Sequence, residues 1–140
     1  MIAGTVVLLP TADDRLVGIR GMLLDSPLST CNVISTDGPR ATEAARICAA
    51  ITAAAPDPPL TIVAFGSTST LVPAVALAQR SAHRRVREYV LIEPDLPPVS
   101  DGWPDAHVLV FSDGEQNQAR LRGWTILPLD SIADWAPGDE

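Results

Sequence analysis

The sequence contains few of the residues on which several classes of protein depend. Its two cysteines, Cys31 and Cys48, are too few for a disulfide framework, and their spacing matches no C-x-x-C or other metal-ligand motif. We expect both to be reduced thiols in the core and expect the protein to bind no metal or other cofactor. No apolar run approaches the ~20 residues that cross a bilayer, which argues against a membrane-spanning segment.

Positive charge is also scarce. Ten basic residues stand against seventeen acidic ones, giving a formal net charge of -7, whereas nucleic acids and anionic membrane surfaces attract proteins through clustered positive charge. The sequence thus predicts no nucleic-acid or membrane partner. The first residues, MIAGTVVLLP, have no positively charged segment before their apolar run and are more typical of a first strand than of a secretion signal, so we expect a cytoplasmic protein.

One local cluster of positive charge departs from this pattern. Arg80, Arg84, Arg85 and Arg87 lie with His83 at the predicted end of one helix, where cations favourably oppose the helix dipole. They form either an ordinary solvated helix end or a dock, near Arg84 and Arg85, for a phosphate or an acidic partner such as a carrier protein.

The composition indicates one folded domain. A chain of 140 residues with 46% hydrophobic and 19% charged residues is long enough to bury a core and too short for an elaborated lid. We expect residues 1–135 to form the domain and residues 136–140 to fray.

Strand and helix patterns alternate along the chain. Short apolar runs rich in β-branched residues predict strands at residues 5–9, 31–35, 61–65, 89–92, 107–111 and 124–127. Helical patterns lie between them, at residues 16–24, 41–54, 73–78 and 116–122. A loop rich in proline and aspartate, residues 93–105, separates the fourth and fifth strands. This alternation predicts an α/β fold, a single small domain with a mostly parallel sheet of about six strands and helices on both faces.

The segment TIVAFGSTSTLVPAVALAQ, residues 61–79, predicts a buried strand, a tight turn of small residues and a helix. This is the arrangement of a nucleophile elbow, in which a G-x-S-x-G motif places a serine on a sharp turn before a helix. Gly66 keeps the first glycine of that frame, Thr68 takes the serine position and Thr70 takes the second glycine position. The four consecutive hydroxyls of residues 67–70 exceed what one helix cap requires.

The order of these segments resembles the core of the α/β-hydrolase superfamily, and the elbow is particularly similar to that of the thioesterase branch. The resemblance spans nearly the whole chain. The strand ending at Leu9 resembles the one before the oxyanion loop, the Asp37-Gly38-Pro39 turn resembles the turn after the next strand, and residues 91–95 and 108–113 resemble the strands after the elbow. The resemblance implies a minimal hydrolase-like core without a lid, with the catalytic acid near Asp113.

Several residues depart from the hydrolase pattern. Pro10 and Thr11 stand where many members have His-Gly, and Thr68 replaces the serine. The last predicted strand is followed by LPLDSIADWAPGDE, which contains no histidine. The two histidines of the chain are His83, at the far end of the elbow helix, and His107, which opens a strand, so neither is placed to be the base of a triad. The sequence therefore argues against ordinary Ser-His-Asp hydrolysis.

Without a triad, the elbow still supplies donors for an oxygen atom. Its first amide groups and its hydroxyls can polarise a carbonyl, so the candidate catalytic residues are Ser67, Thr68, Ser69 and Asp113, with Glu115 as an alternative acid. The candidate substrate-binding residues are Thr11, Ala12, Asp37, Gly66, Trp103 and Asp130. Most have an ordinary structural alternative, since hydroxyls cap helices, aspartates form turns and a large aromatic side chain covers a sheet.

Three functions are compatible with these residues. The first is binding of a small carbonyl-bearing molecule and promotion of a non-hydrolytic step, such as cyclisation, isomerisation or another proton transfer. The second is acyl transfer or thioester chemistry on groups delivered by a carrier protein, with Thr68 or Ser69 as acceptor. The third is a non-catalytic binding or scaffolding pseudo-hydrolase. Because the chain has little room for a lid, a homodimer in which a second subunit covers the elbow is a further hypothesis.

Overall fold

The computed structural model describes residues 4–98, 100 and 102–137. Strands and helices alternate in it, and short 3₁₀ helices (η) occur in several connections. None of the helices described is long and apolar enough to pass through a bilayer. The elements are β1 (Thr5–Leu8), α1 (Asp14–Leu24), β2 (Thr30–Asn32), η1 (Arg40–Thr42), α2 (Glu43–Ala54), β3 (Leu60–Phe65), η2 (Gly66–Leu71), α3 (Val72–Ser81), β4 (Val86–Ile92), β5 (His107–Phe111), α4 (Asn117–Leu121), β6 (Thr125–Leu127) and η3 (Leu129–Asp134).

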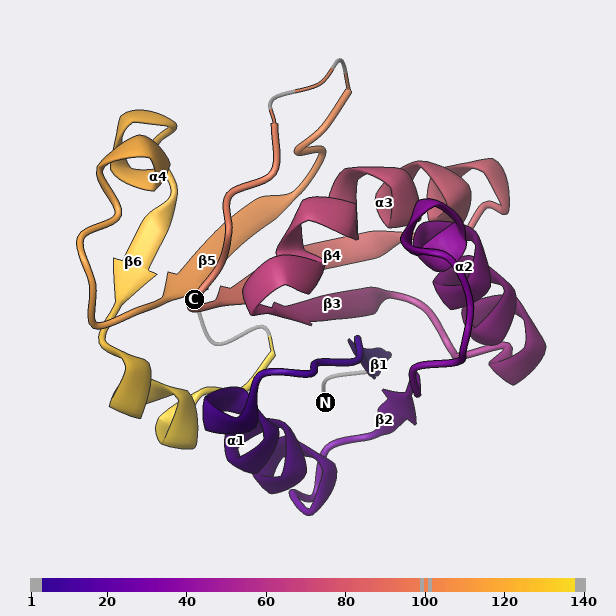
Figure 1. Cartoon of the computed structure of the whole chain (residues 1–140), viewed down its shortest axis with the longest axis horizontal. Coiled ribbons are helices and arrows are strands. Elements are labelled where there is room, and N and C mark those ends of the chain that lie inside the picture. Colours follow the sequence, from indigo (N-terminus) through magenta and orange to yellow (C-terminus); the bar gives the residue numbers. More distant parts are fainter. Residues whose placement is uncertain (1–3, 99, 101, 138–140) are drawn as a thin grey trace.

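The six strands form one open, parallel sheet in the order β2-β1-β3-β4-β5-β6. This confirms the predicted α/β fold with its parallel sheet (Figure 1). The chain first adds β2 on one side of β1 and then crosses back to add β3 on the other side. The strand order therefore reverses between β1 and β3, and the loops that follow these two strands diverge there. In open α/β sheets, ligands bind at such a point, outside the carboxyl ends of the strands.

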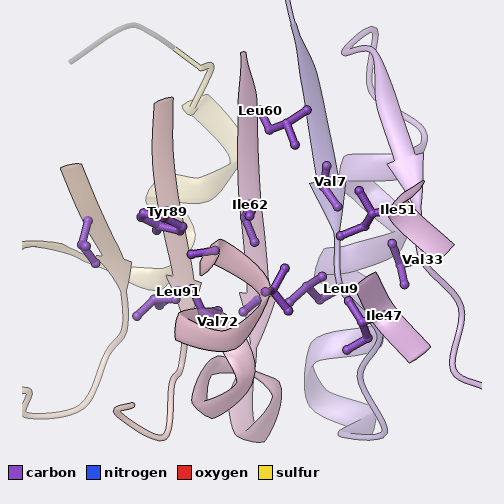
Figure 2. Packing of buried hydrophobic residues seen from close by; sticks show 14 of the residues in the cluster. Val7, Leu9, Val33, Ile47, Ile51, Leu60, Ile62, Val72, Tyr89 and Leu91 are labelled. Carbon is purple, nitrogen blue, oxygen red and sulfur yellow. The ribbon is translucent and has the colours of Figure 1, made fainter. Parts of the chain in front are cut away.

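A hydrophobic layer covers each face of the sheet. On one face α2, α3 and α4 pack on strand residues such as Ile62, and on the other α1 and η3 pack on residues such as Val63. Figure 1 shows these two groups of helices on opposite sides of the sheet, and Figure 2 shows Ile51 of α2 beside Val7 of β1 in the first layer. Successive side chains of a strand point to opposite faces of the sheet. A central strand that is buried on both faces therefore has apolar residues at successive positions, which explains the continuous apolar runs of the sequence.

Trp103 covers the part of β4 and β5 that a crossover helix would otherwise cover. In the described residues between these strands there is no helix, and Trp103, only 5% exposed, packs into the core there. Its ring meets those of Tyr89 and Trp124 edge to face, with centroid separations of 5.5 and 5.7 Å. Trp103 also borders a hollow of about 280 Å³ beside α3. Of its two predicted roles, this packing favours the cover of the sheet over the wall of a ligand site.

Some element boundaries differ from the prediction because side chains supply additional hydrogen bonds. Helix α1 begins at Asp14 rather than at residue 16, since Asp13 Oδ1 accepts a hydrogen bond from the Arg15 backbone N–H (3.0 Å). The tail after β6, for which no helix is predicted, forms η3, and Asp113 Oδ1 accepts a hydrogen bond from its first amide, that of Leu129 (3.0 Å). Of the predicted frayed end, residues 138–140 lie outside the described residues.

Replacing Trp103 with alanine is expected to lower the free energy of unfolding by about 3–5 kcal/mol, because it leaves a cavity beside Tyr89 and Trp124. Urea denaturation followed by circular dichroism measures the change. Leu121→Ala is the control, since Leu121 is 80% exposed on α4 and its truncation should change stability by less than about 0.5 kcal/mol. A loss below about 1 kcal/mol for Trp103→Ala would contradict the covering role.

Asp105 links the Trp103 cluster to α3. Its Oδ1 accepts a hydrogen bond from the Tyr89 hydroxyl (2.5 Å), and its Oδ2 pairs with Arg80 Nη2 (3.0 Å). Burial raises the pKa of Asp105, but the hydrogen bonds from Tyr89 and Arg80 outweigh it and hold this pKa below its ordinary value. Burial, and after it the Asp105 carboxylate, raises the pKa of Tyr89, so the hydroxyl stays protonated and donates.

This arrangement predicts a pH dependence of stability. Because folding lowers the pKa of Asp105, its carboxylate stabilises the fold above the unfolded pKa, about 4, and that contribution is lost as pH falls through the folded pKa. The free energy of unfolding should fall between about pH 5 and pH 2, and it should fall less steeply in Asp105→Asn. Denaturation at a series of pH values gives both slopes, and equal slopes would disprove the prediction.

Candidate functional site

Gly66 makes the sharp turn at the end of β3. Its φ of +57° lies in the left-handed region, which glycine adopts without the steric cost that other residues bear. Its carbonyl oxygen accepts a hydrogen bond from the Asp95 amide (3.1 Å), and a β-carbon here would lie 3.4 Å from Leu16 Cδ1. The loop after β4 and the beginning of α1 therefore both pack against Gly66.

Thr68, at the predicted nucleophile position, lies two residues beyond this turn and is buried. Its Oγ1 donates a hydrogen bond to the Phe65 carbonyl (2.8 Å) and accepts one from the Phe65 amide (3.0 Å). The hydroxyl thus satisfies both backbone groups of the last residue of β3. Ser69 is fully buried, and its Oγ contacts no polar partner among the described residues. In this arrangement neither hydroxyl is open to a substrate.

Ser67 is the hydroxyl residue that the elbow exposes to solvent. It follows Gly66 directly, and its carbonyl oxygen accepts a hydrogen bond from Thr70 Oγ1 (2.8 Å). Thr70 is half-buried, and its hydroxyl, like that of Thr68, donates to a backbone carbonyl. Of the predicted run of four hydroxyls, two bind backbone carbonyls within the turn, one is buried and Ser67 remains available.

Thr11 and Ala12 lie in the loop after β1, on the other side of the reversal point from Gly66. This loop and the elbow leave neighbouring strands, since β1 pairs with β3 and the Leu9 amide continues the pairing by donating to the Val63 carbonyl (2.9 Å). Thr11 Oγ1 accepts a hydrogen bond from the Asp13 amide (3.1 Å), and Ala12 is exposed. The structure thus brings these two predicted binding residues to the same edge of the sheet as Gly66.

Charged side chains gather beside this point. Asp13 Oδ2 pairs with Arg15 Nη2 (2.9 Å) at the beginning of α1. The side-chain hydrogen bond between them is the main cause that lowers the pKa of Asp13 and raises that of Arg15. Glu93 adds to the rise in the pKa of Arg15, so its carboxylate lies within electrostatic reach of the guanidinium. Glu93 itself has a left-handed φ of +44° directly after β4.

Glu93 and Asp113 connect the loops that follow β4, β5 and β6. Glu93 Oε1 accepts a hydrogen bond from the Asp113 amide (2.9 Å), and Asp113 Oδ1 accepts one from the Leu129 amide (3.0 Å). Asp113, the predicted acid, therefore holds the start of η3 with one oxygen. Asp113 is a predicted site residue, whereas Arg15 and Glu93 are not, although Glu93 follows β4 directly and Asp113 lies two residues after β5.

Three predicted binding residues lie elsewhere. Asp37 is exposed in the turn after β2, the edge strand beyond β1. Asp130 is exposed in η3 beyond the opposite edge strand, β6. Trp103 is part of the core over β4 and β5. The structure therefore does not gather these three around Gly66.

Both histidines lie at the amino edge of the sheet, opposite Gly66. His107 opens β5, and His83, with φ of +60°, follows the end of α3. About 15 residues of helical rise, on the order of 20 Å, separate His83 from Thr68. Their placement agrees with the prediction that neither serves the elbow. Among residues 4–98, 100 and 102–137, no three His, Cys, Asp or Glu side chains form a group that would hold a metal ion.

The arginine cluster after α3 also lies at the amino edge. Arg80 pairs with Asp105, and Arg84 donates from Nε to Gln79 Oε1 (2.7 Å) and from Nη2 to Thr52 Oγ1 (3.0 Å). Arg85 is exposed. Arg80 and Arg84 therefore bind other residues of the fold. The predicted dock for a carrier protein lies at the amino edge of the sheet, opposite the edge that carries the elbow.

A hollow of about 430 Å³ lies over β5 and β6 beside η3. It contains none of the predicted site residues, and its floor is apolar, with Leu109 and Phe111 from β5 and Trp135 after η3. This volume lies within the range of small-molecule binding sites. The carboxyl edge instead carries hydroxyl and charged side chains of the loops after β1, β3, β4 and β5, and ligands of open α/β sheets bind outside this edge.

The two adjacent hydroxyls should differ in their effect on stability. Thr68→Val keeps the shape but leaves the Phe65 amide and carbonyl without their side-chain partner, and we expect a loss of about 1–3 kcal/mol in the free energy of unfolding. Ser67→Ala, at an exposed position, is the matched control and should change it by less than about 0.5 kcal/mol. Urea denaturation of both variants measures this, and equal losses would refute the assignment.

Comparisons with known proteins identified no relative of this chain. No protein-family model matches the chain, and no curated protein or solved structure matches it. Its function is therefore inferred from the residues at the carboxyl edge.

Proposed function

We propose that this protein binds a small carbonyl-bearing molecule at the carboxyl edge of the sheet and promotes a non-hydrolytic proton transfer, as in an isomerisation or cyclisation. The observation that carries the proposal is the exposed Ser67 hydroxyl, placed by the left-handed turn at Gly66 where the strand order reverses. The all-parallel sheet and this turn are compatible with a reduced α/β-hydrolase core. Fold alone does not select a function; the residues of the site do.

The surrounding charges support polarisation of a carbonyl. Ser67 and Arg15 are donors, and Arg15 is permanently charged because a guanidinium does not lose its proton near neutral pH. Their hydrogen bonds to the carbonyl oxygen would stabilise the negative charge that develops there when a neighbouring carbon loses a proton. This contribution needs no covalent intermediate on the protein.

Glu93 is the carboxylate best placed to accept that proton. Its Oε1 is held by the Asp113 amide (2.9 Å), which fixes the side chain while Oε2 remains for a substrate. A proton taken from the substrate carbon by Oε2 is returned to another atom of the same molecule, so the step is balanced without an oxidant or a water molecule. Positioned general bases of this kind contribute about 100-fold or more to a rate.

A second candidate is a non-catalytic binding protein with the same site. The observation that favours it is that Thr68 and Asp113, two of the four predicted catalytic residues, both hold backbone groups. The same donors would then bind a carbonyl without changing it. The acyl-transfer alternative gains no support from the arginines, since they lie at the amino edge.

Proton exchange distinguishes the two candidates. The protein in D₂O is incubated with a panel of enolisable carbonyl compounds, such as pyruvate and cyclohexanone, and loss of their α-proton signals is followed by NMR. We expect acceleration of at least one probe, with a fall of about 100-fold in Glu93→Gln and in Ser67→Ala. Asp25→Asn, which removes an exposed carboxylate at the far end of α1, is the control and should keep the full rate.

The outcomes separate the hypotheses clearly. Acceleration that survives Glu93→Gln would remove Glu93 from the mechanism, and acceleration that Asp25→Asn also abolishes would indicate a loss of folding. Binding of the probes without exchange, detected as shifts of the Ser67 amide, would favour the non-catalytic candidate.

A further inference from the structure

Arg20 lies in α1 and directs its guanidinium at the carboxyl ends of β1 and β2. Nε donates to the Leu9 carbonyl (2.8 Å), and Nη2 donates to the carbonyls of Leu8 (3.0 Å) and Val33 (2.7 Å). Nη2 also contacts Asn32 Oδ1 (2.7 Å). These four acceptors lie on the last residues of β1 and β2 and on the residues directly after them, and they hold the planar group in one orientation.

The remaining nitrogen of this guanidinium is unoccupied. Nη1 makes no hydrogen bond to a described residue, is not among the buried polar atoms that lack a partner, and belongs to a residue that lines an open hollow. The acceptors on the other two nitrogens are neutral, and within the described part of the chain the ion pairs are Arg15–Asp13 and Arg80–Asp105. Burial lowers the pKa of Arg20, but a guanidinium remains protonated at neutral pH. Arg20 is therefore a partly buried cation that pairs with no carboxylate among the described residues.

A hollow of about 250 Å³ lies directly at Arg20. Its walls are apolar side chains from α1 and from the segment after β2, among them Val17, Leu24 and Ile34, and the hydroxyl residues Thr11 and Ser35 border it. Val17 is 50% exposed and Ile34 is 67% exposed. A fixed cation thus lies next to an open apolar surface and two hydroxyls.

We propose that this hollow binds the carboxylate of a small molecule with a branched aliphatic body. One carboxylate oxygen accepts a hydrogen bond from Arg20 Nη1, and the other accepts one from the Ser35 or Thr11 hydroxyl. The aliphatic body covers Val17 and Ile34. Charge-assisted hydrogen bonds of this kind are about twice as strong as neutral ones, and the orientation of Arg20 is set before the ligand arrives, which lowers the entropic cost of binding.

This site goes beyond the proposed function and does not depend on it. The hollow lies between α1 and the ends of β1 and β2, whereas Gly66 and Ser67 follow β3 on the other side of β1. Loss of proton-transfer activity in Glu93→Gln therefore says nothing about this site. Conversely, loss of carboxylate binding would leave the proposal for Ser67 intact.

The test is an NMR titration of ¹⁵N-labelled protein with 4-methylpentanoate. We expect saturable shifts of the Arg20 Nε–H and of the Val17, Ile34 and Ser35 amides. The neutral 4-methylpentanamide should bind about tenfold more weakly, because it offers no charge to the guanidinium. 3-Methylbutyl phosphate tests whether the cation takes phosphate instead.

Two matched substitutions keep the test independent of the structural role of Arg20. Ile34→Asp places a carboxylate at the rim of the hollow and should weaken 4-methylpentanoate binding about fivefold through like-charge repulsion. Leu121→Asp makes the same change of charge on α4, at a position 80% exposed, and should leave the affinity within about twofold. Both positions are exposed, so neither substitution threatens the fold.

Four results would overturn the proposal. They are equal binding of the amide and the carboxylate, no effect of Ile34→Asp, shifts spread over the surface without saturation, and tight binding of the phosphate without binding of the carboxylate. The last would assign the hollow to phosphate esters.

Discussion

Parallel pairing of β1 with both β2 and β3 is the constraint on which the rest of this structure depends. It brings the carboxyl ends of the strands to one edge, where the last carbonyl and amide groups of each strand need partners. Side chains supply several of them: Arg20 binds carbonyls of β1 and of the residue after β2, and Thr68 binds both backbone groups of Phe65. Polar side chains at this edge therefore bind backbone groups, and only polar atoms without such a bond are available to a ligand.

This requirement separates residues that are available for a ligand from those that are not. Thr68 and Asp113 carry the functional groups that chemistry would need, yet each binds a backbone group. Ser67 follows the one residue with a left-handed φ in the turn, Gly66, and so its hydroxyl projects into solvent. Glu93 stands between the two cases, since its Oε1 accepts a hydrogen bond from the Asp113 amide and no described residue donates one to Oε2.

The two arginines of α1 show how one helix serves both sides of the reversal point. Arg15 lies in its first turn and pairs with Asp13, and the charge of Glu93, after β4, contributes to the raised pKa of Arg15. Arg20 lies further along the helix and reaches the ends of β1 and β2. Fixed cations therefore flank the loop after β1, in a chain whose net charge is -7. Local geometry, rather than overall charge, decides where such a protein presents positive potential.

The sequence by itself determined the fold class, since continuous apolar strands alternating with helical patterns leave a covered parallel sheet as the solution, and it placed both histidines away from the elbow. It also identified Gly66 as the turn. Only the tertiary structure decided which elbow residue is exposed, that η3 forms against Asp113, that Glu93 binds the Asp113 amide and that Arg20 binds the ends of β1 and β2. These depend on contacts between residues distant in the sequence, and spacing along one chain does not encode which strand ends meet.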